Sequence, residues 1–324
     1  MSVLLEAKNL KKYYATPRGL LHAVDDVSFQ IRKGTTIGFV GESGCGKSTL
    51  GKVIMGLEVA TGGQVLYEGR DITYPGRKER KQLNKELQMI FQDPFSSLDP
   101  RMSISEIIAE PLIIHKVYKK KAQMMERVYE LMDTVGLARR LENSYPHELD
   151  GGRRQRIGIA RALAVEPKFL VCDEPVSALD VAIQAQVLNL LQDLQEERKL
   201  TYLFITHDLS VAKHISDEIC VMYLGQLVEK CAADELYENT LHPYTKALLS
   251  AIPIPDIGIK KTRMLMSGEL TSPIEPKEQC RFAPRCPYAS DKCFAENPKL
   301  KDLGNNHFVA CHKVKTLQDK EYVF

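Results

Sequence analysis

One segment of eight residues constrains the fold of this chain more than any other. Residues 41–48 read Gly-Glu-Ser-Gly-Cys-Gly-Lys-Ser and match the pattern G-x-x-x-x-G-K-[ST]. In this pattern the glycines let successive backbone N–H groups turn inward and bind phosphate oxygens at the start of a helix. The apolar residues 35–40 predict a buried strand before the segment, and a helix-like segment follows it. A glycine-rich turn that matches the pattern by chance has no reason to lie between a buried strand and a helix. The sequence therefore predicts a nucleoside triphosphate site.

A metal ion is expected beside the phosphates. Lys47 can reach the β- and γ-phosphates, and Ser48 offers a hydroxyl ligand to Mg²⁺. The apolar stretch 169–172 predicts a second buried strand, which is followed by Asp173 and Glu174. Such an acidic pair alone is usually a solvated strand end. In a chain with a phosphate loop, Asp173 is expected to hold the Mg²⁺ shell and Glu174 to polarise an attacking water.

Strands and helices alternate along most of the chain, which predicts an α/β fold with a parallel sheet. We expect a mostly helical insertion at about 93–165 and a small loop-rich appendix after about 255. The sequence thus predicts a nucleotide-binding domain over 1–255 and a C-terminal extension over 256–324. Strands are expected at 3–9, 24–31, 169–172 and 202–205, a hairpin at 219–229 turning near Gly225, and helices at 122–135, 153–165 and 181–197.

The composition of the 324 residues excludes several classes of protein. With 44% hydrophobic and 27% charged residues, the chain is ordinary globular rather than disordered or fibrous. Its 44 basic and 42 acidic residues leave a net charge of +2, which gives no support to a surface that coats nucleic acid. No apolar run approaches the ~20 residues that cross a bilayer, and Glu6 interrupts the short apolar N-terminus, so no signal peptide is expected. We expect a cytosolic protein whose role at a membrane comes through partners.

The order of these motifs resembles the nucleotide-binding subunits of ABC transporters, over roughly residues 4–255. The resemblance implies that Tyr14 stacks on adenine, with Tyr13 as a rival, and that Gln92 touches the metal and faces the membrane subunits. His207 would be the switch histidine that contacts the γ-phosphate, although a lone histidine after a strand is more often structural. The implied ATP site comprises Tyr14, Gly41, Ser43, Gly44, Cys45, Gly46, Lys47, Ser48, Thr49 and Gln92, with Mg²⁺ held by Ser48, Gln92 and Asp173 and with Glu174 and His207 as catalytic residues.

The same resemblance implies a head-to-tail dimer of ATPase subunits. Each ATP would lie between the phosphate loop of one subunit and the signature residues of the other. Hydrolysis would then reset the dimer and drive conformational change in the attached membrane subunits. The signature residues are Asp150, Gly151, Gly152 and Arg153, and the loop between the two subunits carries Ser177 and Asp180.

The signature departs from the family pattern Leu-Ser-Gly-Gly-Gln, because Asp150 replaces the serine and Arg153 replaces the glutamine. One interpretation is a helix-capping replacement without functional cost, since aspartate is a good N-cap. The other rests on the γ-phosphate, to which the family's serine donates, whereas an ionised aspartate can only accept. Its charge near another anion costs energy unless Arg153 or Arg154 offsets it. This second interpretation predicts a heterodimer in which the site built from the partner's phosphate loop and Asp150 is impaired.

Two further segments narrow the subfamily. Residues 242–249, His-Pro-Tyr-Thr-Lys-Ala-Leu-Leu, resemble the C-terminal extension of oligopeptide and dipeptide permease ATPases, which would begin at about 233. Residues 95–101 and 173–180 are more similar to the F-type than to the D-type subunit of those permeases. The resemblance implies ATP-driven import of peptides, while nickel or another small solute stays open because selectivity lies in other subunits. The implied partners are two membrane-spanning permease subunits, a second ATPase subunit in a heterodimer and an extracytoplasmic solute-binding protein, but no nucleic acid, and the implied location is the cytoplasmic face of the cell membrane.

Four of the eight cysteines, at 280, 286, 293 and 311, gather near the C-terminus. In a chain without a secretion signal they indicate a metal site rather than disulfides. No close pair has the C-x₂₋₄-C spacing of structural zinc, and four cysteines also suit a [4Fe–4S] cluster. Peptide permease ATPases with Cys-Arg-Phe and Arg-Cys-Pro, as at 280–282 and 285–287, carry such a cluster. The resemblance therefore favours an iron–sulfur cluster, with Zn²⁺ or metal-free thiols as alternatives, at Cys280, Cys286, Cys293 and Cys311.

Two functions of other classes are weighed against transport. A soluble ABC ATPase in translation or DNA repair usually has two cassettes in one chain or a long coiled-coil insertion, and the sequence has neither. A nucleic-acid-binding module built on the cysteine-containing tail would need a basic, aromatic-rich surface. Residues 280–312 mix both signs of charge and contain few aromatic residues, so transport is the stronger prediction.

Overall fold

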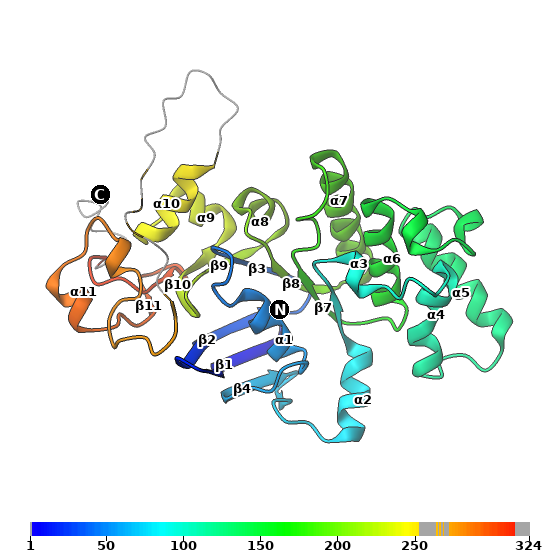
Figure 1. Ribbon diagram of the computed structural model, residues 1–324, viewed down its shortest axis with the longest axis horizontal. Helices are drawn as coiled ribbons and strands as arrows, with labels where there is room; N and C mark the ends of the chain where they lie inside the picture. The colour runs from blue at the N-terminus through cyan, green and yellow to red at the C-terminus, as the bar shows by residue number, and fades with distance from the viewer. Residues whose placement is uncertain (1, 253–263, 265, 267, 269–271, 315–324) are drawn as a thin grey trace, which may run out of the picture. The chain divides into compact units, whose positions relative to one another are not determined.

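The computed structural model describes residues 2–252, 264, 266, 268 and 272–314, which divide into two compact units. The first, which we call the helical unit, comprises Ser2, Arg32–Thr35 and Pro75–Ile205. The second, the P-loop unit, comprises Val3–Ile31, Thr36–Tyr74 and the described residues from Thr206 on. Figure 1 labels helices and strands of both units where there is room. The two domains expected from the sequence, 1–255 and 256–324, are continuous stretches of the chain, whereas these units are not. The expected domain boundaries stay a prediction.

An antiparallel sheet with the strand order β2-β1-β4-β5 forms one layer of the P-loop unit. Its first two strands are longer than the strands predicted at 3–9 and 24–31. β1 continues past an irregularity between Lys8 and Lys11, where its register with β4 shifts. The polar residues at this point interrupt the alternation, which is why the second half of the strand was not predicted. The strands are β1 (Val3–Thr16), β2 (Gly19–Arg32), β4 (Gly62–Tyr67) and β5 (Arg70–Asp71).

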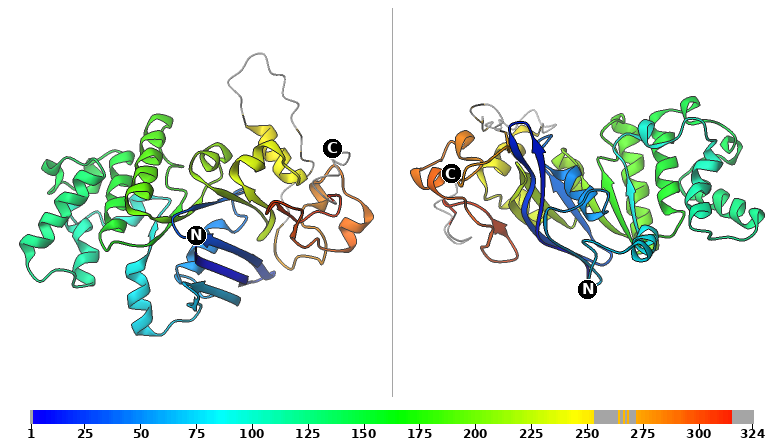
Figure 2. Two further views of the ribbon diagram at one scale, coloured as in Figure 1. Left: turned by 180° about the vertical axis from the view of Figure 1, so that it is seen from behind. Right: turned by 60° about the horizontal axis from the view of Figure 1, so that its bottom comes forward.

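A second set of strands in the P-loop unit has the order β11-β12-β10-β9-β3. β3 and β9 are parallel, and β9 and β10 form the hairpin that was predicted around Gly225. β12 pairs with β10, with Val309 opposite Glu229, so residues near the C-terminus extend this sheet. Both views of Figure 2 show this orange-to-red segment beside the strands it joins. The bounds are β3 (Thr36–Val40), β9 (Glu218–Tyr223), β10 (Gln226–Ala232), β11 (Lys301–Asp302) and β12 (Phe308–Val309).

An aromatic cluster fastens the C-terminal residues to the end of β9. The rings of Tyr223 and Tyr244 have centroids 4.7 Å apart, and those of Tyr223 and Phe282 5.3 Å apart, both edge to face. All three side chains are buried, and such pairs add about 0.5–1.5 kcal/mol each beyond the burial of their area. The helices of this unit are α1 (Lys47–Ile54), α8 (Leu209–Ile215), α9 (Ala233–Glu238), α10 (Pro243–Ala251) and α11 (Asp291–Ala295), with a 3₁₀ turn η3 (Ala283–Arg285).

The helical unit contains three parallel strands in the order β8-β7-β6. Every residue of β7 and β8 is buried, as expected for parallel strands that read as continuous apolar runs. Residues 94–163, all of which are described, contain helices and turns but no strand. The strands are β6 (Leu87–Ile90), β7 (Phe169–Asp173) and β8 (Thr201–Ile205), and the helices are α2 (Arg77–Glu86), α3 (Pro94–Ser97), α4 (Ile104–Ile114), α5 (Lys121–Thr134), α6 (Gly151–Leu163) and α7 (Val181–Arg198), with 3₁₀ turns η1 (Arg139–Leu141) and η2 (Pro146–Glu148).

Helix boundaries in this unit follow from local chemistry. The Asp180 carboxylate accepts the backbone N–H of Ile183 at 3.0 Å and so caps α7. Gly136, with φ of 69°, follows α5 in the left-handed conformation typical of a helix end. The predicted helices 122–135, 153–165 and 181–197 are confirmed as α5, α6 and α7, with ends that differ by at most two residues. Among the described residues, no helix combines the length and the apolar character that crossing a membrane requires.

Candidate nucleotide-binding site

The phosphate loop lies between β3 and α1, where the sequence predicts it. Gly41 and Gly46 have φ of 152° and 107°. A Cβ at Gly41 would lie 2.2 Å from the carbonyl oxygen of Met222, and one at Gly46 would lie 1.9 Å from that of Ala23. Only glycine fits such close backbone approaches. The loop therefore presents backbone rather than side chains at the start of α1, as phosphate binding requires.

Lys47 folds back across this loop. Its Nζ donates to the carbonyl oxygens of Gly41 at 2.8 Å and Glu42 at 3.0 Å, and its side chain is buried. Burial raises the pKa of the neighbouring Cys45 thiol, which therefore stays protonated. The ammonium is thus a positive charge held against two backbone carbonyl groups of the loop, where a phosphate anion is expected to bind.

The predicted catalytic acids belong to the helical unit. Asp173 ends β7 and is buried, and Glu174 follows with φ of 45°. A positive φ at a residue other than glycine is uncommon and is enriched at functional sites. The Nε2 of Gln92, just after β6, donates to Oε2 of Glu174 at 3.0 Å. Because β6 and β7 are parallel neighbours, their carboxyl ends meet, and the structure brings these two predicted residues together.

Two tyrosines compete for the predicted adenine contact. The Tyr13 hydroxyl donates to Asp25, and its ring stacks on His22 with centroids 3.9 Å apart. Neighbouring strand residues point to opposite faces, and Tyr14 instead lies beside Lys12, whose Nζ is 4.6 Å from the ring centroid. Lys12 pairs with Glu58, soon after α1, at 3.0 Å. Tyr14 therefore lies on the same side of β1 as Lys12 and the residues that follow α1, which favours it over Tyr13, and its role stays a prediction.

His207 belongs to the P-loop unit, in the turn before α8. Asp208 beside it caps this helix by accepting the backbone N–H of Ser210 at 2.7 Å. The Thr206 backbone N–H donates to the carbonyl oxygen of Phe39 on β3 at 3.1 Å, which places the turn at the end of β3 that leads into the phosphate loop. This position suits the predicted γ-phosphate contact.

The signature residues form the start of α6. Asp150 accepts the backbone N–H of Arg153 at 2.8 Å, and the Arg153 Nε lies 3.5 Å from its other oxygen. The capping geometry predicted for Asp150 is therefore present, together with a partial charge offset. A Cβ at Gly152 would lie 2.5 Å from Cγ2 of Ile183, so glycine is needed for close packing against α7. The Ser177 hydroxyl donates to the carbonyl oxygen of Glu174 at 3.1 Å, which ties the predicted dimer loop to the catalytic segment.

Comparisons with known proteins decide the family. Family models described as ABC transporter and as oligopeptide/dipeptide transporter, C-terminal region, match residues 24–177 and 228–293. The oligopeptide transport ATP-binding protein OppF of Bacillus subtilis (strain 168) is 61% identical over 311 residues, which cover 95% of this chain and 96% of the relative. OppF of Escherichia coli (strain K12) is 50% identical over 319 residues, 98% of this chain and 95% of the relative. This chain belongs to the ABC transporter ATP-binding proteins.

Solved ABC cassettes share the fold. The dimeric post-hydrolysis structure of the ATP-binding cassette MJ0796 bound to ADP and Pi has a TM-score of 0.65 and 29% identity, over 71% of this chain and 99% of that one. CbiO1 from Clostridium perfringens, part of the ABC transporter complex cbiONQ, has a TM-score of 0.65 and 26% identity, over 74% and 92%. The predicted P-loop ATPase fold is confirmed, and the chain is an ATP-hydrolysing ABC subunit whose family implies permease partners. The glycine cradle and the buried Lys47 fit Mg²⁺–ATP.

The iron–sulfur cluster predicted for this ABC ATPase is wrong. Cys280, Cys286, Cys293 and Cys311 do line one cavity, but its volume is only about 10 Å³, room for at most one water. The described residues contain no group of three or more His, Cys, Asp or Glu side chains placed to hold a metal ion, and nothing in them supports the zinc alternative. Burial raises the pKa of Cys280 to about 11 and also raises that of Cys286 and Cys311, so these three side chains are thiols in the structure described. Cys280 and Cys286 pack instead against the apolar core.

The sequence does not predict that the C-terminal segment, by which we mean the described residues from Ala233 on, touches the phosphate loop. The Arg285 guanidinium binds the Glu42 carboxylate, and the Tyr244 hydroxyl accepts the Glu42 backbone N–H. Both residues occur in the family-like segments 242–249 and 285–287, but nothing in their local pattern indicates a partner more than 200 residues away. The acidic residue at the second loop position is a signal in the sequence, because a carboxylate near a bound anion is repelled unless a positive charge pairs with it.

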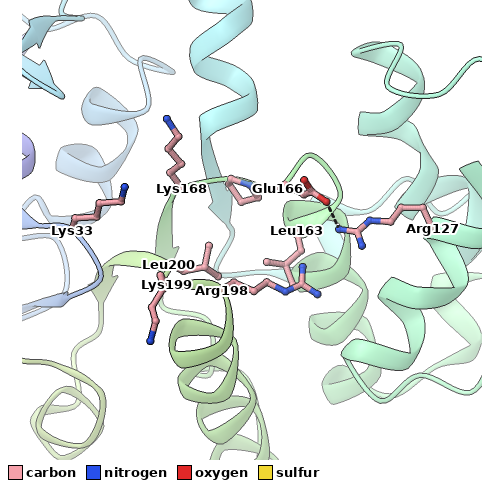
Figure 3. Close-up of a pocket in the computed structure, with 9 residues that line it drawn as sticks. Lys33, Arg127, Leu163, Glu166, Lys168, Arg198, Lys199 and Leu200 are labelled. Atoms are coloured by element: carbon pink, nitrogen blue, oxygen red, sulfur yellow. Dashed lines mark hydrogen bonds and ion pairs between the residues drawn. The ribbon is translucent and has the colours of Figure 1, made fainter.

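A separate hollow of about 520 Å³ lies at the amino-terminal ends of β7 and β8 in the helical unit (Figure 3). Its lining is mostly basic and includes Lys168, Arg198 and Lys199, and Arg127 pairs with Glu166 at 3.0 Å. Because Asp173 occupies the opposite end of β7, this hollow is not part of the candidate nucleotide site.

Proposed function

We propose that this ABC ATPase powers the import of oligopeptides or dipeptides across the cytoplasmic membrane. The observation that carries the proposal is that one chain matches both the ABC transporter model and the C-terminal region of oligopeptide/dipeptide transporters. Relatives named oligopeptide transport ATP-binding proteins are 61% and 50% identical over nearly the whole chain, which supports the same role.

This function requires a larger complex. We infer two membrane-spanning permease subunits, a second ATPase subunit and an extracytoplasmic solute-binding protein that delivers the peptide. The second ATPase is a different chain in this proposal, because a heterodimer lets the two composite sites differ where Asp150 replaces the family's serine. The chain would act as a peripheral subunit at the cytoplasmic face of the membrane.

The residues of the site have complementary roles in this proposal. Bound Mg²⁺–ATP supplies the γ-phosphoryl bond whose hydrolysis releases free energy for transport. The backbone N–H groups of residues 41–48 and the Lys47 ammonium bind the phosphates, and Tyr14 stacks on the adenine. Ser48, Gln92 and Asp173 are the side chains that would hold the metal.

Glu174 is the proposed general base. Its carboxylate would accept a proton from the water that attacks the γ-phosphate, and His207 would orient toward the same phosphate. The hydrogen bond from Gln92 fixes one oxygen of Glu174 at 3.0 Å, and the positive φ of Glu174 fixes its backbone. Such pre-positioning lowers the entropy cost of reaching the reactive geometry.

Reconstitution tests the proposal. The chain would be assembled with its permease subunits and second ATPase in liposomes, with the solute-binding protein added, and ATP hydrolysis measured with an oligopeptide, a dipeptide or nickel. We expect peptide together with the binding protein to raise hydrolysis, and nickel to have no effect. Stimulation by nickel alone would replace the peptide assignment, and copurification with ribosomes or DNA instead of membrane subunits would overturn the transport assignment.

A further inference from the structure

Glu42, the second residue of the phosphate loop, is bound by two residues from the far end of the chain. The Arg285 guanidinium forms a bidentate ion pair with its carboxylate, with Nη1–Oε2 at 2.7 Å and Nη2–Oε1 at 3.1 Å. The Tyr244 hydroxyl accepts its backbone N–H at 2.9 Å. Arg285 and Tyr244 lie 243 and 202 residues further along the chain. The C-terminal segment therefore contacts the loop that is expected to bind phosphate.

The contacts of Glu42 leave its backbone little freedom. Lys47 donates from inside the loop to the Glu42 carbonyl oxygen at 3.0 Å, so the carboxylate, the N–H and the C=O of this residue are all engaged. Tyr244 is itself immobilised, because its ring is buried in the aromatic cluster with Tyr223 and Phe282. A rotation of the peptide at Glu42 would break at least one of these bonds, and the loop geometry is thus set partly by the C-terminal segment.

The charge of Glu42 is the second reason that its partner matters. A carboxylate beside a triphosphate repels it, and this repulsion is strongest where water is scarce. The side chains of Arg285 and Glu42 are 10% and 25% exposed, so solvent screens the pair only weakly. Hydrogen bonds to Glu42 raise the pKa of Arg285, which stays charged. The guanidinium thus cancels a negative charge that would otherwise oppose nucleotide binding.

Arg281 offers a matched comparison on the same turn. It binds the Asp25 carboxylate and the Leu224 carbonyl oxygen. This contact is linked to the phosphate loop through backbone, because the Gly225 N–H, next to Leu224, donates to the carbonyl oxygen of Cys45 at 2.8 Å. Arg281 therefore attaches the C-terminal segment to the ATPase strands but does not pair with a charged side chain of the phosphate loop. Arg285 attaches the same segment and also pairs with the charged Glu42 of that loop.

We propose that Arg285 is a positioning residue of the ATP site, which neutralises Glu42 and holds the phosphate loop in the conformation that binds triphosphate. The inference deepens the proposed function and rests on ATP binding at this loop. The C-terminal segment then takes part in the ATPase reaction itself, since the phosphate loop has the contacts to Glu42 only when that segment is packed against it.

A double-mutant cycle separates this role from a merely structural one. Binding of Mg²⁺–ATP would be measured in the assembled complex with Glu174→Gln present to prevent hydrolysis, and KM and kcat would be measured without it. We expect Arg285→Ala to weaken ATP binding about tenfold, or ~1.4 kcal/mol, and to raise KM more than it lowers kcat. In the Glu42→Gln background the same change should weaken binding less than about twofold, because no charge is left to neutralise. Arg281→Ala should act equally in both backgrounds.

The outcomes are distinct. An equal loss of affinity on Arg285→Ala with and without Glu42→Gln would mean that Arg285 only stabilises the fold, and no loss in either background would mean that the contact is idle. Both results overturn the proposal. If thermal unfolding shows that Arg285→Ala does not fold, Arg285→Gln keeps much of the side-chain volume and is put through the same cycle. Failure of the unaltered complex to bind Mg²⁺–ATP would instead refute the proposed function, whatever Arg285 does.

Discussion

Lys47 and Glu174 are expected to divide nucleotide binding from hydrolysis between them. Lys47→Ala removes the ammonium held inside the phosphate loop, so tight ATP binding should be lost. Glu174→Gln removes only the proton acceptor, so ATP should stay bound in a closed dimer while kcat falls by roughly 10²–10⁴. Equilibrium ATP binding and steady-state hydrolysis by the assembled complex measure the two effects. Normal turnover with Glu174→Gln would show that Glu174 is not the general base.

His242 should make stability depend on pH. Complete burial lowers its pKa to about 4, and its neutral Nδ1 accepts the Tyr244 N–H at the start of α10 at 3.1 Å. Between the ordinary pKa near 6.5 and that value, the unfolded chain binds a proton that the folded chain does not. The contribution of His242 to the free energy of unfolding should therefore fall as pH drops through this window, by at most about 1.4 kcal/mol per pH unit. Urea unfolding at several pH values measures the slope, and His242→Asn, which keeps an acceptor but does not titrate, should make it shallower.

Elements were predictable from the sequence where the pattern is local. The helices α5–α7 and the buried strands β3, β7 and β8 follow from apolar periodicity, and the phosphate loop from its glycines. The pairing of β12 with β10 was not predictable, because β12 has only two residues and no local pattern of its own. Its hydrogen bonds to β10 join it to a segment far away in the sequence. The iron–sulfur prediction from the four cysteines was wrong for a related reason. Residue type and spacing do not reveal the volume of the cavity that the thiols line, which is only about 10 Å³.

Glu229 on β10 joins that strand to the C-terminal elements. Its buried carboxylate accepts from the Leu241 N–H at 2.7 Å and the His242 N–H at 3.2 Å, and it lies 2.8 Å from His307 Nε2. Glu229→Ala leaves these buried groups without a partner, so the free energy of unfolding should fall by about 3–5 kcal/mol. Chemical unfolding measures the loss, and limited proteolysis should cut the variant first after α9. The exposed carboxylate of Glu238, changed to alanine in the same way, should cost less than about 0.5 kcal/mol.

Across the P-loop unit, the C-terminal segment is integrated with the ATPase strands rather than appended to them. It adds β12 to the sheet, buries Phe282 against Tyr223 and binds the phosphate loop through Arg285. These contacts use three kinds of interaction at three places. A change in how this segment is docked would therefore reach the ATP site directly, without passing through the helical unit.

At the level of the assembled transporter, Asp150 predicts unequal ATP sites. Its carboxylate caps α6 and is only partly offset by Arg153 at 3.5 Å, so in a head-to-tail dimer it would face the partner's ATP with negative charge. Serine also caps helices well, so Asp150→Ser should change the free energy of unfolding by less than about 1 kcal/mol. It should nevertheless raise hydrolysis at the site built on the partner's phosphate loop. Glu174→Gln in this chain abolishes hydrolysis at the site built on its own phosphate loop. The remaining ATPase rate of the complex then measures hydrolysis at the site built on the partner's phosphate loop. Mutating the partner's catalytic glutamate is the control. An unchanged rate would leave Asp150 as a helix cap alone.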